Sequence, residues 1–116
     1  LQTIKIKTVG VPREVEFLDK LKKKNPGKTI QCQCYLRDSS GKSVKDPETG
    51  ERRRVDNVVI DGKNGKAYEV TSQTADKSAQ IEKEIRIRNA GGEYVRNRST
   101  GELVRIGKVS EVVRID

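Results

Sequence analysis

The sequence predicts an α/β (α+β) domain in the order helix, three strands, helix, strand and β extension. Two segments carry apolar residues at helical spacing, several shorter segments alternate apolar with polar residues, and clusters of Gly, Pro and Asn separate them. The chain has 116 residues, which is enough for one hydrophobic core but not for two. We therefore expect a single domain over residues 11–116, with residues 1–10 as a linker or an edge strand.

The first predicted helix follows Pro12, a residue that suits the first turn of a helix. Phe17, Leu18 and Leu21 recur at helical spacing, and the helix is expected to stop at residues 25–27, Asn-Pro-Gly. On a helical wheel Glu14 falls between these three apolar residues. We therefore expect Glu14 to face inward, toward the sheet.

Three strands are predicted next, over residues 29–36, 54–60 and 66–71, with a polar loop over residues 38–51. Cys32 and Cys34 are two positions apart on the first of these strands, so we expect both on the same face. That geometry is poor for a mutual disulfide, and the pattern favours two buried small hydrophobic residues. The last two strands are expected to form a hairpin around a five-residue loop, residues 61–65.

A second helix is predicted over residues 74–89, with Ser78, Ile81 and Ile85 as its inward stripe and Gly91-Gly92 after its end. A strand in EYVRNR is expected to follow it. The segments LVRI and EVVRI then predict a short β extension at the C-terminal end.

Composition limits the chemistry and suggests the partners. Only 32% of the residues are hydrophobic, and the formal net charge is +8, so we expect a thin core and a surface that attracts polyanions. The chain has no histidine, which excludes a Ser-His-Asp triad and any zinc site with histidine ligands. No stretch approaches the roughly 18 apolar residues of a membrane span, and no signal peptide is expected.

Acidic residues occur on three of the predicted elements. A symmetric hairpin would set Glu69 opposite about residue 57, within one position of Asp56, and Glu14 is expected to face the same sheet. Three carboxylates in a partly buried place repel one another unless a cation neutralises them. The residues therefore predict a site for Mg²⁺, which takes carboxylate oxygens and keeps several waters.

This pattern resembles the PD-(D/E)xK nuclease superfamily over residues 12–97, with an acid on the first helix, an Asp in RVDNVVI and a Glu in AYEVT. The resemblance implies a restriction-endonuclease-like αβββαβ core, with the β extension added at its C-terminal end. It also implies that Glu14, Asp56 and Glu69 bind a divalent metal, Mg²⁺ with Mn²⁺ or Zn²⁺ as substitutes, and act in catalysis. The family has a Lys two residues after the strand Glu, where this chain has Thr71, so Thr71 is expected to position water or phosphate.

Other residues are expected to complete such a site. Accessory roles are predicted for residues just after the third strand and on the second helix: Gln73, Gln80 and Lys83. Contacts to nucleic acid are predicted for basic residues at the start of the second strand and of the second helix: Arg52, Arg53, Arg54 and Lys77.

The segment GGEYVRN…TGELVRI is similar to the C-terminal toxin domains of bacterial contact-dependent growth inhibition proteins. The resemblance implies secretion or cell-surface delivery as part of a larger protein, and action in the cytoplasm of a target bacterium. It implies cleavage of tRNA or DNA there, and neutralisation by a dedicated immunity protein, expected to be acidic.

Other interpretations of the same residues stay open. Asp56 follows three arginines and can form an ion pair with one of them, and Glu14 has Arg13 and the lysines of its own helix nearby. The chain then suits a non-catalytic basic module that binds nucleic acid or protein. A metal-independent RNase on another small α/β fold is the third hypothesis, with Lys, Arg, Thr and Tyr carrying its chemistry.

Overall fold

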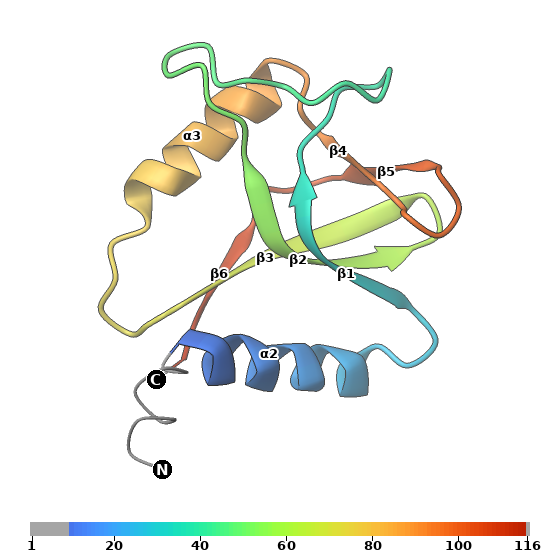
Figure 1. Cartoon of the computed structure of the whole chain (residues 1–116), viewed down its shortest axis with the longest axis vertical. Helices are drawn as coiled ribbons and strands as arrows, with labels where there is room; N and C mark the ends of the chain where they lie inside the picture. Colours follow the sequence, from blue (N-terminus) through green and yellow to red (C-terminus); the bar gives the residue numbers. More distant parts are fainter. Residues whose placement is uncertain (1–9, 116) are drawn as a thin grey trace.

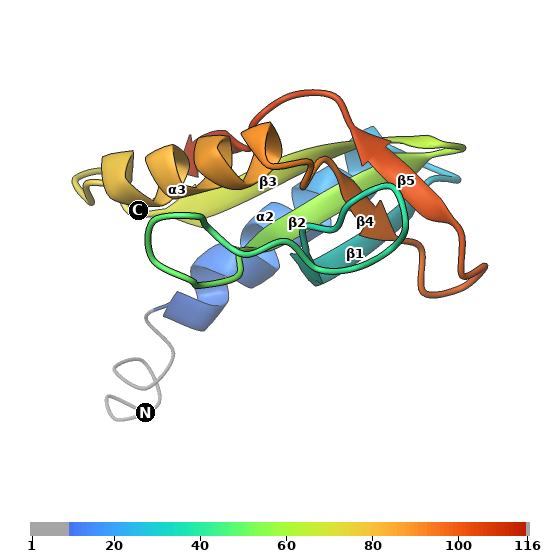
Figure 2. The same cartoon turned by 90° about the horizontal axis from the view of Figure 1, so that it is seen from above.

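The computed structural model of the protein describes residues 10–115, and the side chains of residues 14–115. These residues form a mixed α+β structure in which a six-stranded sheet lies between two helices (Figures 1 and 2). Helix α2, Gly10–Lys24, covers one face of the sheet, and helix α3, Ser78–Asn89, lies on the other. Most of the predicted linker or edge strand, residues 1–9, lies outside the described residues.

Helix α2 forms where the apolar spacing predicts it. Phe17 and Leu21 are buried and pack with Val59 and Val70 of the sheet, which makes one of two hydrophobic clusters. The last turn carries three lysines, whose positive charges interact favourably with the negative end of the helix dipole. Gly27 then turns the chain, with φ +81°. In the described part of the chain, neither helix has the length and hydrophobicity that crossing a membrane requires.

Strands β1 (Thr29–Tyr35), β2 (Arg54–Asp61) and β3 (Asn64–Thr71) form an antiparallel meander, as predicted. The hairpin between β2 and β3 is tighter than the expected five-residue loop, because Asp61 pairs with Asn64 and leaves a two-residue turn. Tyr68, and not Glu69, therefore lies opposite Asn57. The predicted register was wrong by one residue.

A local irregularity in β1 and β2 changes which side chains share a face. Gln33 has φ +55°, and the pairing of the two strands passes over Gln33 and Asp56. Side-chain alternation is interrupted there, so Cys34 is buried while Cys32 is exposed, and both are free thiols. The expectation of two cysteines buried on one face was wrong for this reason.

Helix α3 begins at Ser78, four residues after the predicted start, because the side chain of Asp76 accepts hydrogen bonds from Ser78 N and Oγ just before it. Its buried residues are Glu84 and Ile87, whereas Ile85 is 44% exposed. The predicted inward stripe was therefore wrong at Ser78 and Ile85, which are both exposed, while Ile81 is half-buried. Ile87 joins the second and larger hydrophobic cluster, which lies between α3 and the sheet.

After α3 the chain returns to the free edge of β3. The antiparallel strands β4 (Tyr94–Arg96) and β5 (Leu103–Ile106) come first, and β5 runs parallel to the start of β3. Strand β6 (Glu111–Arg114) then pairs in parallel with the end of β3, from Tyr68 to Thr71. The predicted strand after α3 and the β extension are confirmed, and they hold the end of β3 in the middle of the sheet.

Candidate functional site

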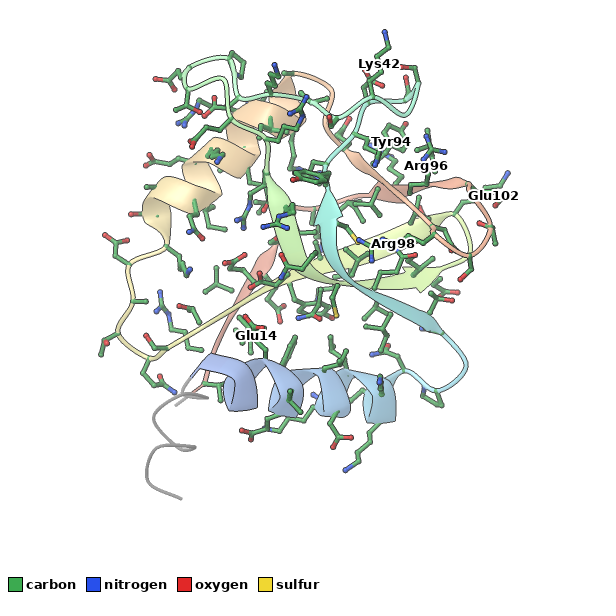
Figure 3. All side chains as sticks on the ribbon, in the orientation of Figure 1. Glu14, Lys42, Tyr94, Arg96, Arg98 and Glu102 are labelled. Carbon is green, nitrogen blue, oxygen red and sulfur yellow. The ribbon has the colours of Figure 1, made fainter. Side chains whose placement is uncertain are left out.

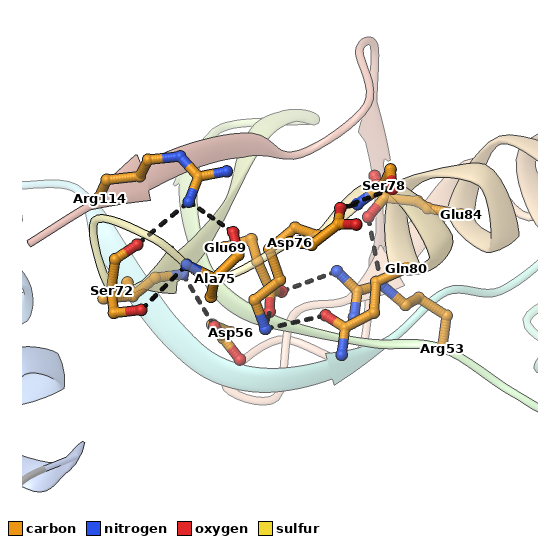
Figure 4. Close-up of polar contacts among 12 residues, drawn as sticks. Arg53, Asp56, Glu69, Ser72, Ala75, Asp76, Ser78, Gln80, Glu84 and Arg114 are labelled. Atoms are coloured by element: carbon orange, nitrogen blue, oxygen red, sulfur yellow. Dashed lines mark hydrogen bonds and ion pairs between the residues drawn. The ribbon is translucent and has the colours of Figure 1, made fainter.

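A chain of buried ion pairs connects β3, the start of β2 and helix α3. Oε2 of Glu69 lies 2.7 Å from Nη2 of Arg53, and Oε1 of Glu69 lies 3.4 Å from Nζ of Lys77. The other side of the Arg53 guanidinium, Nε, lies 3.3 Å from Oε1 of Glu84. We call Lys77, Glu69, Arg53 and Glu84 the ion-pair chain (Figure 4).

The inner part of the ion-pair chain is almost closed to solvent, and Lys77 is its outer end, with 20% of its side chain exposed. Glu84 is fully buried, Glu69 is 4% exposed, and Arg53 is 8% exposed. Glu84 also accepts a 2.6 Å hydrogen bond from the Ser110 amide, which satisfies its second oxygen. Two positive and two negative groups balance one another here, so each buried charge has an opposite partner within hydrogen-bonding range.

Lys77 brings a positive charge next to Glu69, which has the uncharged Thr71 two residues after it on β3. It stands immediately before α3, and its ammonium group donates a 3.2 Å hydrogen bond to Oε1 of Gln80 besides pairing with Glu69. Thr71, two residues after Glu69, is buried at 4% exposure and carries no charge. The residue before α3 thus supplies a cation beside Glu69, whereas the β3 position two residues after Glu69, Thr71, carries none.

Asp56 lies next to this group from the neighbouring strand. Its Oδ2 accepts a 2.9 Å hydrogen bond from the amide of Val70, the residue that follows Glu69 (Figure 4). Asp56 therefore lies beside β3 at the point where the ion-pair chain begins. It forms no ion pair with Arg52, Arg53 or Arg54 among the described residues.

A small hollow opens at Asp56 on the α2 side of the sheet. It has a volume of about 140 Å³ and is lined by residues of α2, β1 and β2, including Glu14, Gln33, Asp56 and Asn57. Glu14 lies on the side of α2 that faces the sheet (Figure 3), yet its side chain is exposed. Glu14 thus faces the sheet, as predicted, but its side chain is open to solvent, because the helix and the sheet leave a hollow at this end of α2. We call this the acidic hollow.

The structure therefore brings two of the three predicted carboxylates together and places the third elsewhere. Asp56 and Glu14 share the acidic hollow, while Glu69 points to the α3 side and is neutralised by Arg53 and Lys77. Among residues 14–115 no group of three Asp, Glu, Cys or His side chains is arranged to hold a metal. Asp56 and Glu14 still supply two hard carboxylate ligands at the acidic hollow, which is also lined by Val15 and Leu18, and Mg²⁺ commonly binds through one or two carboxylates with retained waters.

The residues predicted to contact nucleic acid divide into two groups. Arg53 is buried within the ion-pair chain, whereas the side chain of Lys77, the outer member of the chain, is 20% exposed. Arg52 and Arg54 are exposed; Arg52 donates to Oγ of Ser43, and the Arg54 guanidinium lies 5.7 Å from the centre of the Tyr35 ring. Arg52, Arg54 and the exposed part of Lys77 are thus placed to meet a polymer, and Arg53 is not.

The predicted accessory residues also separate. Gln80 accepts the hydrogen bond that Lys77 donates. Lys83 lies 3.3 Å from Glu51 in the long loop, and Gln73 donates a 3.4 Å hydrogen bond to the carbonyl of Arg114. Gln80 is therefore the one of these three that the structure joins to the ion-pair chain.

Sequence reasoning missed Glu84 as a partner of Arg53. A signal for it was present, since Ile81, Glu84 and Ile87 recur every three residues and so lie near one face of the helix. A carboxylate on an apolar helix face predicts a buried cationic partner.

Comparison of the chain with protein-family models, curated proteins and solved structures finds no match.

Proposed function

We propose that this protein is an endonuclease that hydrolyses phosphodiester bonds of nucleic acid with the help of a divalent metal. The observation that carries the proposal is the position of Lys77, whose ammonium group is held by Glu69 and Gln80. Asp56 binds the amide of the residue next to Glu69. Asp56 and Lys77, from different elements, thus contact consecutive residues of β3, Asp56 at the amide of Val70 and Lys77 at the side chain of Glu69, which supports a phosphate site at this end of the strand.

The acidic hollow is the proposed metal site. Asp56 and Glu14 would hold Mg²⁺, or Mn²⁺ or Zn²⁺ in its place, with water in the other positions. Such a metal lowers the pKa of a bound water and offsets negative charge on the reacting phosphate. Glu69 acts as a positioning residue that orients Lys77, and Lys77 stabilises phosphate charge in the role that Thr71 does not fill.

The substrate and the biological setting extend the same proposal. The formal charge of +8 supports a polyanionic substrate, which we propose is tRNA or DNA. Residues 12–97 resemble PD-(D/E)xK nucleases, and the C-terminal segment is similar to toxin domains of contact-dependent growth inhibition proteins. We therefore propose a toxin domain that a larger secreted or cell-surface protein delivers into the cytoplasm of a target bacterium. An acidic immunity protein would neutralise it in the producing cell.

One observation favours a second candidate function, a non-catalytic basic module that binds nucleic acid or protein. Both oxygens of Glu69 face cations of the protein itself, so this carboxylate needs no metal for its neutralisation. Under this alternative the ion-pair chain is purely structural, and the exposed basic residues carry the function.

Incubation of the purified protein with supercoiled plasmid and with total tRNA separates the candidates, when each reaction is run with Mg²⁺ and with excess EDTA. The proposal expects cleavage of at least one substrate with Mg²⁺ and none with EDTA. Cleavage of RNA that persists in EDTA would instead support a metal-independent RNase. Salt-sensitive binding of both polymers without cleavage in either buffer would support the binding module.

A further inference from the structure

Three arginines gather around one small hollow at the outer side of β1 and β4. The hollow has a volume of about 90 Å³ and is lined by Cys34, Tyr35, Arg37, Arg96 and Arg98. Figure 3 labels Arg96 and Arg98 on this side of the molecule, beyond β1 and away from α2. We call this the arginine hollow.

The three guanidinium groups have no carboxylate partner within the described residues, where most other arginines do. Arg53 and Arg86 lie 2.7 and 2.8 Å from carboxylate oxygens, and Arg88 and Arg105 each lie 3.8 Å from Glu93. Like charges at one place repel one another unless an anion joins them. The positive charge of the arginine hollow is therefore available to an anion from outside.

Each of the three side chains is nevertheless held in position by a backbone carbonyl. Nη1 of Arg37 donates to Gly41 O at 2.8 Å, Nη1 of Arg96 donates to Gly101 O at 2.7 Å, and Nη2 of Arg98 donates to Gln33 O at 2.7 Å. One such bond fixes a guanidinium group and leaves its remaining N–H groups free for a ligand. These side chains are thus ordered before a ligand binds. Binding therefore loses less side-chain conformational entropy.

The packing around Arg96 supports this preorganisation. Gly41 has φ +91°, and a Cβ atom built there would collide with Nη2 of Arg96. A residue other than glycine at position 41 would strain the backbone and displace the guanidinium. The loop before β2 is thus shaped to admit Arg96 at this place.

We propose that the arginine hollow binds a backbone phosphate of a polynucleotide. Guanidinium groups bind phosphate oxygens through paired N–H donors, which gives them geometry as well as charge. The hollow is small, at about 90 Å³, which suits a compact anion such as one phosphate group. Tyr35 borders it at 40% exposure with Arg54 over its ring, so a neighbouring base has an aromatic surface to stack on.

The position of Gln33 favours a polymer over an isolated phosphate. Its carbonyl holds Arg98, and the same residue lines the acidic hollow together with Asp56. The two hollows are thus neighbours along β1, so a nucleic-acid strand with one phosphate in the arginine hollow can continue toward Asp56. This direction of the strand rests on the proposed function, whereas phosphate binding at the arginines does not.

The test is the binding of fluorescein-labelled 12-nucleotide single-stranded RNA and DNA, measured by fluorescence anisotropy in EDTA over a series of salt concentrations. The variant Arg37→Gln/Arg98→Gln removes two charges but keeps amide donors of shorter reach. The matched control Lys22→Gln/Lys23→Gln removes two charges from the exposed face of α2. Thermal melts establish that each variant is folded, and Arg98→Lys provides a milder change that keeps the charge and loses the paired donors.

The arginine variant is expected to bind at least tenfold more weakly at 0.1 M salt, with a salt slope smaller by about 0.7 for each phosphate that it no longer neutralises. The lysine control should change affinity less than threefold, and Arg98→Lys should fall between them. Equal affinity of the arginine and lysine variants for the RNA would overturn the proposal. Loss of inorganic-phosphate binding in the arginine variant with unchanged affinity for RNA would also overturn it, in favour of a free-phosphate site.

These outcomes are separable from those of the proposed function. EDTA suppresses metal-dependent cleavage during the binding measurement, and no carboxylate of the acidic hollow is changed. A protein that binds as expected but cuts nothing would contradict the nuclease proposal alone.

Discussion

The ammonium group of Lys77 lies 3.4 Å from Oε1 of Glu69 and 3.2 Å from Oε1 of Gln80, so two side chains from different elements hold it. Without this lysine, β3 would present Glu69 with Arg53 as its only cationic partner among the described residues. The residue before α3 therefore supplies a cation beside Glu69, where β3 has the uncharged Thr71 two residues later.

Replacement of Lys77 by Ala should reduce cleavage by about 100- to 1000-fold, the loss typical when one preorganised group that stabilises transition-state charge is removed. Lys77→Arg should keep part of the rate, because the charge remains. Initial rates of plasmid nicking or tRNA cleavage measure both effects. Lys22→Ala removes an exposed lysine of α2 and serves as the control; equal rates for the two Ala variants would show that Lys77 has no role.

The buried end of the ion-pair chain should matter for stability. Glu84→Gln leaves Arg53 with one carboxylate in a closed environment, and breaking a buried pair in this way costs about 3 kcal/mol of unfolding free energy. Urea unfolding followed by circular dichroism gives the difference. Glu82→Gln, on the exposed side of the same helix, should change the free energy by less than about 0.5 kcal/mol. A loss no larger at Glu84 than at Glu82 would mean that the pair contributes nothing net.

A second ion pair predicts how stability depends on pH. Arg86 donates to both oxygens of Asp46, at 2.9 and 2.8 Å, and ties the loop over residues 38–51 to α3. The Arg86 hydrogen bond, with others from Glu48 N and Thr49 Oγ1, holds the pKa of Asp46 well below its ordinary value of 3.8. This carboxylate therefore stabilises the fold fully above that ordinary value, and the contribution is lost as the pH falls from there toward the lowered pKa.

Asp46→Asn tests this dependence. The variant should be less stable than the wild type at pH 7, and the difference in unfolding free energy should shrink as the pH falls below about 4, near the ordinary pKa of an aspartate. Urea unfolding at several pH values from neutral to strongly acidic measures it. A difference that stays constant over this range would exclude ionisation of Asp46 as the cause.

Gly92 should tolerate no side chain. A Cβ atom there would lie 2.5 Å from Cγ2 and 2.9 Å from the carbonyl oxygen of Ile87, in the buried seam where α3 ends. Gly92→Ala should therefore cost about 1 to 3 kcal/mol. Gly107→Ala meets no atom within 4 Å and is the matched control, expected to be close to neutral. Equal melting temperatures for the two variants would contradict the packing described for this turn.

Much of the fold was predictable because apolar spacing and turn residues act locally. The apolar spacing of Phe17 and Leu21 placed α2, and the glycines and polar residues between β2 and β3 placed the hairpin. Local patterns did not determine, however, which residues of a helix face the core or which residues of neighbouring strands lie opposite each other. Helix α3 begins four residues later than predicted, Ile85 lies on its exposed side, and the positive φ of Gln33 reverses the faces of the two cysteines.

The candidate site was predictable only in part, because it depends on long-range pairing. The spacing of Asp56 and Glu69 on neighbouring strands predicted that they lie near each other, and the amide of Val70 connects them in the structure. Whether a carboxylate meets another carboxylate or a cation depends on which face each strand presents. Glu69 faces Arg53 and Lys77 on the α3 side, although the pairing of Asn57 with Tyr68 sets Glu69 across from Asp56. The irregularity at Asp56 is what separates the two side chains.

The most direct test of the proposed chemistry is the Mg²⁺-dependent cleavage rate of Asp56→Asn beside that of the wild type. Asparagine keeps an oxygen that can accept from the Val70 amide, so the fold should remain while the charge of the acidic hollow falls. Loss of even an outer partner of a metal ligand costs 10- to 100-fold, so we predict a loss of at least about 100-fold here. A variant that cleaves at the wild-type rate, or wild-type cleavage that continues in EDTA, would contradict a metal-dependent reaction at Asp56.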